Sequence, residues 1–307
     1  DYIYAVLDTL IYAHIFAYPL TREEIWKRTI GVHKNTSKQL RVALTLLVQK
    51  KLVFQKDSYF ALTQKTLSVD RISLHSFSTQ KKERVGELRG IFACIPTVRM
   101  VGVSGSVAAG NAHEDDDIDL YIVCTNHTLW LTRLLMVVVA ELIGLRRRPT
   151  DSLWRDKLCL NMFVEEKNMA VAPLRRDVFS AHEVVQLIPI YDRTSYYERF
   201  LDQNRWVRKI VPNMLKKQKS TIVRNNRSYR DVLLEACVWP INVFLKYVQL
   251  WYMRGRRTHE VIEDGLMQLH PRDKRVEIMD IFQKLRHSMR KKMVKMGQKR
   301  ASSTIGS

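Results

Sequence analysis

The feature of this sequence that most constrains its fold is an acidic run that leads directly into an apolar segment. Asp117-Ile-Asp119 alternates charged and apolar residues, and apolar residues continue to position 124. Side chains alternate between the two faces of an extended strand. The pattern therefore predicts a β-strand over residues 118–124, with Asp117 and Asp119 on one face and about 7 Å apart. Asp115 and Asp116 precede the alternation, and we expect both to stay solvated near the start of the strand.

Two carboxylates on one strand face are suited to binding divalent ions. Carboxylate oxygens favour Mg²⁺ or Mn²⁺. Two such ions about 3.5–4 Å apart can bind both the attacking and the leaving oxygen of a phosphoryl displacement. Asp117 and Asp119 are therefore candidate metal ligands and candidate catalytic residues.

The residues before the acidic run predict a phosphate-binding turn. A β-branched strand is expected at residues 97–103, and Gly105-Ser106 follows it at the start of a short Ala-rich helical segment. Small residues let backbone N–H groups approach a triphosphate, and a helix N-terminus favours anions. We expect the Ser106 hydroxyl to donate to a β- or γ-phosphate oxygen, and Gly110 to let the chain reverse. The glycine patterns of dinucleotide-binding and Walker-type sites are absent from the sequence.

A strand, Gly-Ser, a spacer of ten residues and Asp-x-Asp on a second strand together form a specific pattern. This pattern resembles the signature of the DNA polymerase beta-like nucleotidyltransferase superfamily, which includes poly(A) polymerases, CCA-adding enzymes and antibiotic nucleotidyltransferases. The resemblance covers residues 97–165. It implies that Gly105 and Ser106 cradle the phosphates of an NTP, and that Asp117 and Asp119 bind the metal of a two-metal transfer reaction.

The superfamily usually presents a third carboxylate on a following strand, and this chain departs from that pattern. The matching apolar strand, expected at residues 158–164, offers Asn161. Asparagine can ligate a metal or hold a hydroxyl, but it cannot accept a proton at neutral pH. Three interpretations stay open: Glu165 or Glu166 substitutes, the acceptor hydroxyl needs little help, or the enzyme is slow or inactive.

Residues 1–65 predict three helices followed by a hairpin. The first helix covers residues 4–18, a capping box of Thr21 and Glu24 opens the second, and two short strands are expected within residues 52–62. This order resembles a winged helix-turn-helix, whose third helix can enter a DNA groove. Such a module can instead mediate only protein contacts. The basic residues placed to touch phosphates are Lys34, Lys38 and Arg41.

The rest of the chain is expected to form an α+β protein with a small mixed sheet. Residues 66–96 predict a connecting helix and residues 97–173 the nucleotidyltransferase core, with a helix at 129–145. Residues 174–300 predict a basic helical domain, and residues 301–307 a tail. Two short clusters of residues in the helical part each allow two interpretations. Trp251 to Arg257 could stack on bases or simply end an amphipathic helix, and His270 to Asp273 fits either a site or a helix boundary.

The charge balance favours anionic partners. The net charge is +20 over 307 residues, which attracts nucleic acid, nucleotide phosphates or an anionic membrane surface. The basic segment 286–300 is suited to binding RNA, DNA or an anionic membrane surface. Charged residues interrupt the apolar stretches 129–145 and 232–253, so we expect buried helices and no transmembrane span. The four cysteines form no metal-binding pair in the sequence and indicate a reducing, cytoplasmic compartment.

The sequence thus predicts a nucleotidyltransferase that transfers a nucleoside monophosphate from an NTP to a hydroxyl. RNA or DNA is favoured as the acceptor over a small molecule, because the flanking regions are basic. The alternative is a DNA-binding regulator whose nucleotidyltransferase domain senses a nucleotide with weak or no catalysis. Peripheral membrane contact through the helical C-terminal part is compatible with either function.

Overall fold

The computed structural model describes residues 2–32, 36–148, 151, 153–215, 229–254, 261–269 and 274–304. Lys34, residues 255–257 of the aromatic and basic cluster, and the cluster at 270–273 lie outside these residues. The described chain is a mixed α+β structure with two sheets. A six-stranded sheet has the order β7-β4-β5-β6-β9-β8, and a separate three-stranded sheet has the order β1-β3-β2.

The six-stranded sheet is mixed. β5 pairs parallel with β6, and the other neighbouring strands pair antiparallel. A parallel pair needs a crossover connection, and α8 (Leu129–Leu142) supplies it between β5 and β6. The strands are β4 (Val98–Val103), β5 (Ile118–Cys124), β6 (Leu158–Glu165), β7 (Ile188–Asp192), β8 (Val261–Glu263) and β9 (Leu266–Gln268). The expected strands at 97–103, 118–124 and 158–164 are therefore confirmed to within one residue at each end.

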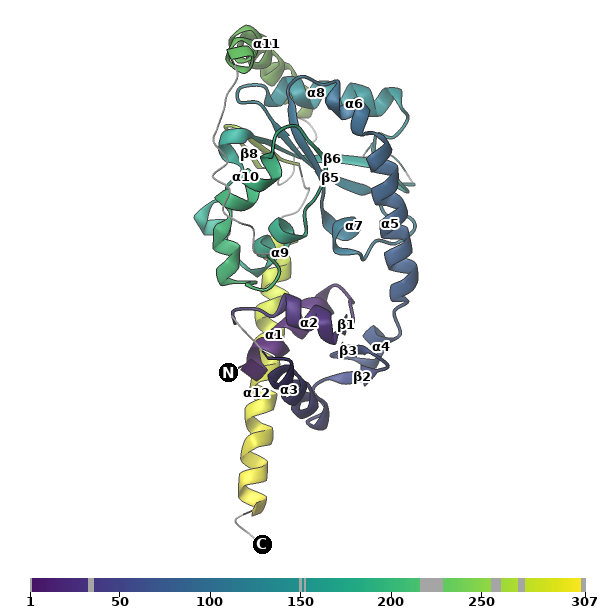
Figure 1. The fold of residues 1–307 in the computed structure, drawn as a ribbon, viewed down its shortest axis with the longest axis vertical. Helices are drawn as coiled ribbons and strands as arrows, with labels where there is room; N and C mark the ends of the chain where they lie inside the picture. The colour runs from purple at the N-terminus through teal and green to yellow at the C-terminus, as the bar shows by residue number, and fades with distance from the viewer. Residues whose placement is uncertain are drawn as a thin grey trace.

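Two apolar layers cover the faces of this sheet. On one face Val101, Leu120 and Ile122 pack against α5, α6 and α8. On the other face Met100, Val123 and Val164 pack against α9 and α10 (Figure 1). The helices are α5 (Arg71–Glu87), α6 (Arg89–Ala93), α9 (Val178–Gln186) and α10 (Tyr196–Gln203), with short 3₁₀ turns η1 (Glu166–Asn168), η2 (Pro173–Arg175) and η3 (Arg205–Lys209).

The C-terminal part differs from the expected helical domain, because it contributes three strands to the sheet. β7 pairs with β4, and β9 pairs with β6 and β8. These strands have only three to five residues, which is too short for a clear period-2 pattern. Their conformation depends on pairing with residues far away in the chain. The helical elements of this part are α11 (Tyr229–Met253) and α12 (Lys274–Thr304).

The N-terminal region contains the expected three helices and a hairpin. The capping box forms as predicted, since the Thr21 hydroxyl accepts from Glu24 N–H at 3.2 Å and Glu24 accepts from Thr21 N–H at 2.8 Å. A second capping box joins Thr36 and Gln39 at the start of the third helix. The elements are α1 (Tyr2–Ile15), β1 (Leu20–Thr21), α2 (Arg22–Arg28), α3 (Ser37–Gln49), β2 (Phe54–Lys56), β3 (Tyr59–Ala61) and α4 (Gln64–Leu67).

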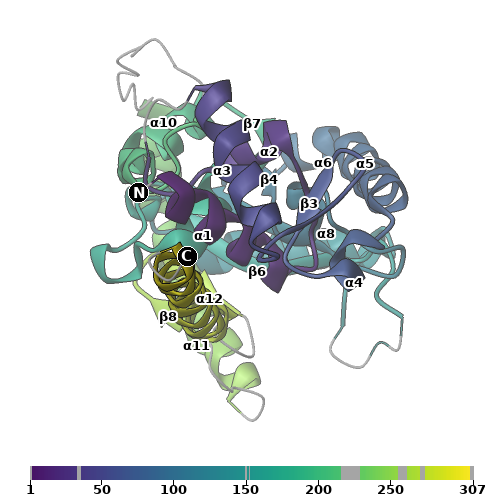
Figure 2. The ribbon, with the colours of Figure 1, turned by 90° about the horizontal axis from the view of Figure 1, so that it is seen from below.

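The last helix returns to this N-terminal region. α12 runs beside α1 in both ribbon views (Figures 1 and 2), and Phe282 is buried in the N-terminal core. The buried Asp8 carboxylate accepts from Arg286 at 3.0 Å and from Arg290 at 2.5 Å. The two ends of the chain are therefore held together by a buried charge cluster as well as by apolar contacts.

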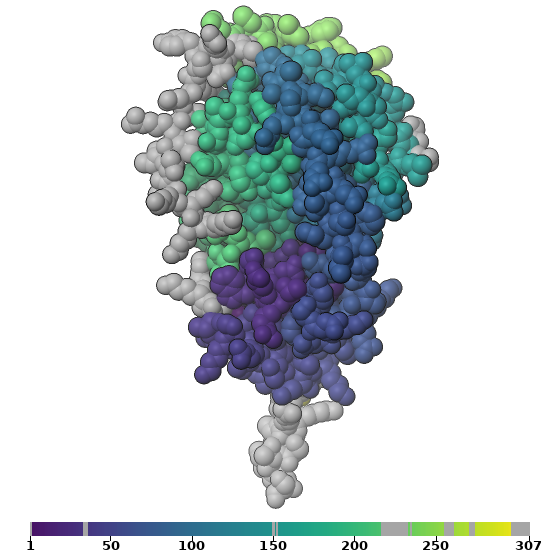
Figure 3. Space-filling view, turned by 45° about the vertical axis from the view of Figure 1, so that its right-hand side comes forward, coloured from purple at the N-terminus to yellow at the C-terminus, as the bar shows by residue number. Residues whose placement is uncertain are grey.

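The N-terminal region also packs on the six-stranded unit. Gly31 N–H donates to the Ile210 carbonyl at 2.7 Å, and the Asn111 side chain donates to the Phe16 carbonyl at 3.0 Å. In the space-filling view the purple N-terminal residues lie directly against the green and blue residues of that unit (Figure 3). The two sheets thus belong to one packed molecule, with an interface between them.

The two apolar stretches differ in how they are buried. No described helix is long and apolar enough to cross a membrane. α8 buries Trp130, Met136 and Ala140 in the main core. α11 does not fit the expectation of a buried helix, because several of its largest apolar side chains are exposed.

Candidate functional site

The Gly-Ser turn lies against the acidic strand. β4 ends at Val103, and the Ser104 N–H donates to the carbonyl of Asp119 at 2.9 Å. Gly105 follows with φ of +63°, and a Cβ placed on it would lie 2.4 Å from Oδ2 of Asp119. Both the positive φ and the close contact require glycine. The turn that opens α7 (Gly105–Ala109) is therefore in van der Waals contact with a candidate metal ligand.

Gly110 has the role expected from the sequence. It ends α7 in the left-handed conformation, with φ of +74°, and it lets the chain reverse toward β5.

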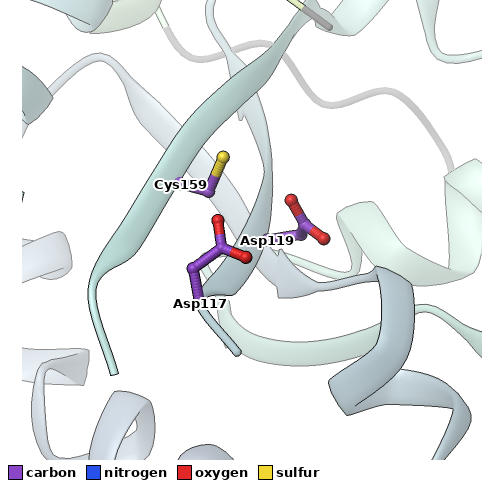
Figure 4. A group of neighbouring side chains, drawn as sticks. All are labelled: Asp117, Asp119 and Cys159. Atoms are coloured by element: carbon purple, nitrogen blue, oxygen red, sulfur yellow. The ribbon is translucent and has the colours of Figure 1, made fainter. Parts of the chain in front are cut away.

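The two aspartates meet a third side chain that sequence reasoning missed. Ligand atoms of Asp117, Asp119 and Cys159 all lie within 4.8 Å of one another. Figure 4 shows the three side chains grouped together above the strands. Cys159 is paired in register with Asp119 across the parallel β5–β6 ladder, so both side chains project from one face of the sheet. Burial, followed by the charges of Asp119 and Asp117, raises the pKa of the Cys159 thiol well above its usual range. The thiol is therefore protonated at neutral pH.

Asn161 lies where the sequence predicts the third polar group of the site. Its Nδ2 donates to Oδ1 of Asp119 at 2.8 Å, and its side chain is buried. The placement of the third strand against the acidic pair is therefore correct. The amide holds the Asp119 carboxylate in a fixed orientation, and it does not itself supply a proton acceptor of carboxylate strength.

Arg147 provides a cation to the same cluster. Its Nη1 donates to Oδ2 of Asp117 at 2.5 Å and contacts Sγ of Cys159 at 3.2 Å. Its guanidinium lies 4.1 Å from the ring centroid of Trp154. Burial lowers the pKa of Arg147, but the neighbouring Cys159 and Asp117 raise that pKa more. The group stays charged and balances part of the negative charge of the aspartates.

Asp116 differs from the prediction that it stays solvated. Its Oδ2 accepts from the Ser106 hydroxyl at 3.0 Å and from His113 N–H at 2.9 Å, and its side chain is half-buried. Asp115 is exposed, as expected. The Ser106 hydroxyl therefore donates to a carboxylate of its own loop, although Ser106 still lines the cavity described below.

A cavity of about 850 Å³ opens above this face of the sheet. One wall holds Gly105, Ser106, the two aspartates and Asn161, and the opposite walls come from α1, α9 and α12. Ligand sites in proteins commonly have volumes of about 300–1,000 Å³. The cavity also has a cationic lining, contributed by Arg28, Arg147, Lys167, Arg175, Lys274 and Arg275.

Glu183 is a further residue that sequence reasoning missed. It projects from α9, is half-buried and lines the cavity. Burial, followed by the charge of Asp119, raises the pKa of Glu183 to about 7, although Lys274 acts in the opposite direction. No local motif marks this residue, because its proximity to Asp119 depends on α9 packing across the sheet.

Glu165 and Glu166, the substitutes considered from the sequence, lie elsewhere. Glu165 is buried and ion-pairs with Lys167 at 3.4 Å, and Glu166 accepts from the Tyr196 hydroxyl at 2.8 Å. The described lining of the cavity includes neither of them.

The donor set fits a divalent cation. Asp117 and Asp119 supply carboxylate oxygens on one side of the cavity, and such oxygens suit Mg²⁺ or Mn²⁺. The guanidinium of Arg147 already lies against Asp117, so the position attracts positive charge. The Cys159 thiol is a softer donor and would contribute fully only after losing its proton.

No protein-family model, curated protein or solved structure matches this chain.

Proposed function

We propose that the chain is a metal-dependent nucleotidyltransferase that moves a nucleoside monophosphate from an NTP to a hydroxyl. The observation that supports this most directly is the contact between Gly105 and Asp119. A turn with approachable backbone N–H groups and a pair of carboxylates share one cavity wall. An NTP needs both, because its phosphates need donors near the metal that its α-phosphate contacts.

This proposal assigns roles to the two aspartates and to the cationic residues of the cavity. Asp117 and Asp119 would hold the divalent ion, which stabilises negative charge developing on the α-phosphate. The cationic lining on the far side, which includes Lys274 and Arg28, would bind the β- and γ-phosphates. Arg147 would exchange its contact with Asp117 for a contact with a phosphate oxygen.

Glu183 is the proposed proton acceptor. The acceptor oxygen forms a bond to the α-phosphorus, the bond from that phosphorus to the bridging oxygen breaks, and pyrophosphate leaves. The hydroxyl proton passes to a base, which works best with a pKa near the working pH. The Glu183 pKa of about 7 meets this condition, whereas Asn161 has no basic group. Asn161 instead orients Asp119.

The cavity dimensions bear on the acceptor. About 850 Å³ holds an NTP and a small part of an acceptor, but not a double helix. We therefore propose that a nucleic-acid acceptor enters by a single-stranded end. The domain assignment belongs to the same proposal: a winged-helix-like region at 1–65 and a nucleotidyltransferase core centred on 97–173, with the later strands completing its sheet.

Transfer from radiolabelled NTPs tests the proposal. Wild-type protein is incubated with each of the four NTPs, Mg²⁺ or Mn²⁺, and RNA, DNA or small hydroxyl acceptors. Asp119→Asn should abolish transfer. Asp115→Asn is the matched control, because it removes the same charge from an exposed position of the same acidic run. Absence of transfer to every acceptor, or equal rates for the two variants, would contradict the proposal.

A second candidate function is supported by the exposure of α3. Lys38 and Arg41 lie on the exposed side of this helix, the helix that enters the groove in winged helices. On this view the chain is a DNA-binding regulator that senses a nucleotide. Salt-sensitive retention of DNA that is lost in a Lys38→Ala/Arg41→Ala variant, together with reversible NTP binding and no covalent transfer, would favour it.

A further inference from the structure

α11 packs on the protein through Met253, which is buried in the main core, through the partly buried Leu245 and Leu250, and through two polar side chains. Oδ1 of Asn242 accepts from the backbone N–H groups of Trp130 and Leu131 at 2.9 and 3.1 Å, which satisfies two open donors at the start of α8. Two helical turns later, the Gln249 amide donates to the Trp130 carbonyl at 2.8 Å and accepts from Arg133. Asn242 and Gln249 are both buried, so specific hydrogen bonds fix the face that α11 turns inward.

The opposite face of α11 carries large apolar side chains in solvent. Trp251 is 75% exposed, Tyr247 67% and Phe244 66%. These residues are spaced by three or four positions, so they form one continuous stripe along the helix. We call this set the α11 stripe; its members are Ile241, Phe244, Tyr247, Val248 and Trp251. The inward face of α11 is therefore mixed, and its outward face is apolar, whereas the outward face of an amphipathic surface helix is usually polar.

We propose that the α11 stripe docks on the surface of an anionic lipid bilayer. Tryptophan and tyrosine prefer the boundary between water and lipid, because their rings are apolar and each carries one polar group. A helix that lies in this boundary buries its apolar face to a depth of about 5–10 Å. Aliphatic members such as Ile241 and Val248 add apolar area, and they are poor partners for stacked bases.

The positive charge of the chain favours an anionic lipid surface. Residues 236–254 contain Lys246 and Arg254 but no Asp or Glu, and the chain carries a net charge of +20. An anionic membrane surface attracts such a protein, and each Lys or Arg near the membrane adds to the attraction. Two copies of the chain would bring equal charges of +20 together, which disfavours a second copy as the occupant.

The position of α11 is compatible with this docking. The helix lies at one end of the molecule, and the C-terminal end of α12 lies at the other (Figure 1). The N-terminal region and α9, which form walls of the cavity, would point away from the membrane. The proposed contact is peripheral, since no described helix is long and apolar enough to span a bilayer.

Vesicle flotation with the full chain tests the proposal. Wild-type protein is mixed with vesicles of phosphatidylcholine alone or of phosphatidylcholine with phosphatidylserine. The test variant is Phe244→Gln/Trp251→Gln. The control is Ile72→Gln/Leu174→Gln, which removes two exposed apolar side chains from α5 and η2. Circular dichroism verifies that both variants are folded.

We expect wild type and control to float with the anionic vesicles, and the test variant to partition at least about tenfold less, because two large apolar side chains no longer enter the lipid. Absence of flotation for the wild type, or equal flotation of the two variants, would overturn the proposal. Equal binding to the neutral vesicles would overturn its anionic part. Self-association that only the test variant loses, seen by sedimentation without vesicle binding, would identify a second copy instead. Loss of single-stranded RNA binding under the same conditions would identify RNA.

Discussion

Glu183 offers the most direct quantitative test of the candidate site. Its pKa of about 7, against the usual 4.5, means that the folded protein binds the proton more tightly than the unfolded chain does. The protonated Glu183 side chain therefore stabilises the folded protein. This contribution to the free energy of unfolding is fully present below pH 4.5, and it is lost as the pH rises through 7. Each tenfold difference in proton affinity corresponds to about 1.4 kcal/mol. The full effect is therefore about 3 kcal/mol, and we expect about 1–3 kcal/mol because water can enter the cavity that Glu183 lines.

Glu183→Gln places a neutral side chain of similar shape at this position. The variant should be more stable than the wild type at pH 8, and the difference in unfolding free energy should widen by about 1–2 kcal/mol between pH 5 and pH 8. Urea denaturation at several pH values measures it. Glu198→Gln, which removes an exposed carboxylate from α10, controls for the loss of one charge. A difference that stays constant with pH, or a variant that is less stable at pH 8, would refute the raised pKa.

The same variant separates a catalytic role from a structural one. If Glu183 accepts the proton from the hydroxyl, Glu183→Gln should lose transfer while gaining stability, a combination that is typical of active-site groups. Mn²⁺ or Mg²⁺ bound near Asp119 should also reduce the stability difference, because the charge of Asp119 is one of the two causes of the raised pKa. Full transfer by the variant would remove Glu183 from the mechanism.

Three further variants test other parts of the structure. Gly105→Ala should abolish transfer and lower the unfolding free energy by about 1–3 kcal/mol, because the residue combines a φ of +63° with a Cβ position 2.4 Å from Asp119. The control is Gly110→Ala, since Gly110 also has a positive φ but a Cβ placed on it has no contact under 3.7 Å. Equal transfer rates for the two variants would contradict the proposed contact. Asn161→Asp places a third carboxylate beside Asp119. The variant should therefore be less stable than the wild type in the presence of a chelator, and Mg²⁺ should raise its melting temperature more. If calorimetry shows the same effect of Mg²⁺ on both proteins, residue 161 does not belong to the carboxylate cluster. Asp8→Asn should lower the free energy of unfolding in urea by about 2–4 kcal/mol, since it leaves Arg286 and Arg290 without their buried partner. An unchanged free energy of unfolding would mean that apolar contacts alone hold α12 on α1.

The sequence predicted the elements whose signals are local. The alternation at Asp117-Ile-Asp119 gave β5 its register, because a strand repeats every two residues and one face of this strand is buried. The Thr21 and Glu24 capping box formed as expected because both partners lie within one helical turn. Gly105 was found because a small residue at a turn is visible without knowledge of the fold. Its contact with Asp119 followed from the order of strand, turn and strand.

The parts of the site that were missed depend on contacts between distant residues. Cys159 joins the aspartates only because β6 pairs parallel with β5 in one particular register. Arg147 reaches Asp117 from the chain that follows α8, and Glu183 arrives on a helix from the opposite wall. A carboxylate on a helix is the most ordinary residue in a sequence. Glu183 is marked out by its place in the cavity wall and by the charge of Asp119 that it meets there.

α11 shows why hydrophobicity alone does not decide which face of a helix is buried. The sequence from 232 to 253 is apolar enough to predict burial, and its polar residues look like interruptions. The positions of Asn242 and Gln249, seven residues apart, place both on one side of the helix. Since α8 presents open N–H groups to Asn242 and a carbonyl to Gln249, these hydrogen bonds act together with the burial of Met253 to decide which side of α11 faces the protein. Phe244, Tyr247 and Trp251 on the other side remain mostly exposed. The lipid proposal has its physical basis in this exposed stripe, because the fold buries one side of α11 and leaves a second apolar side in solvent.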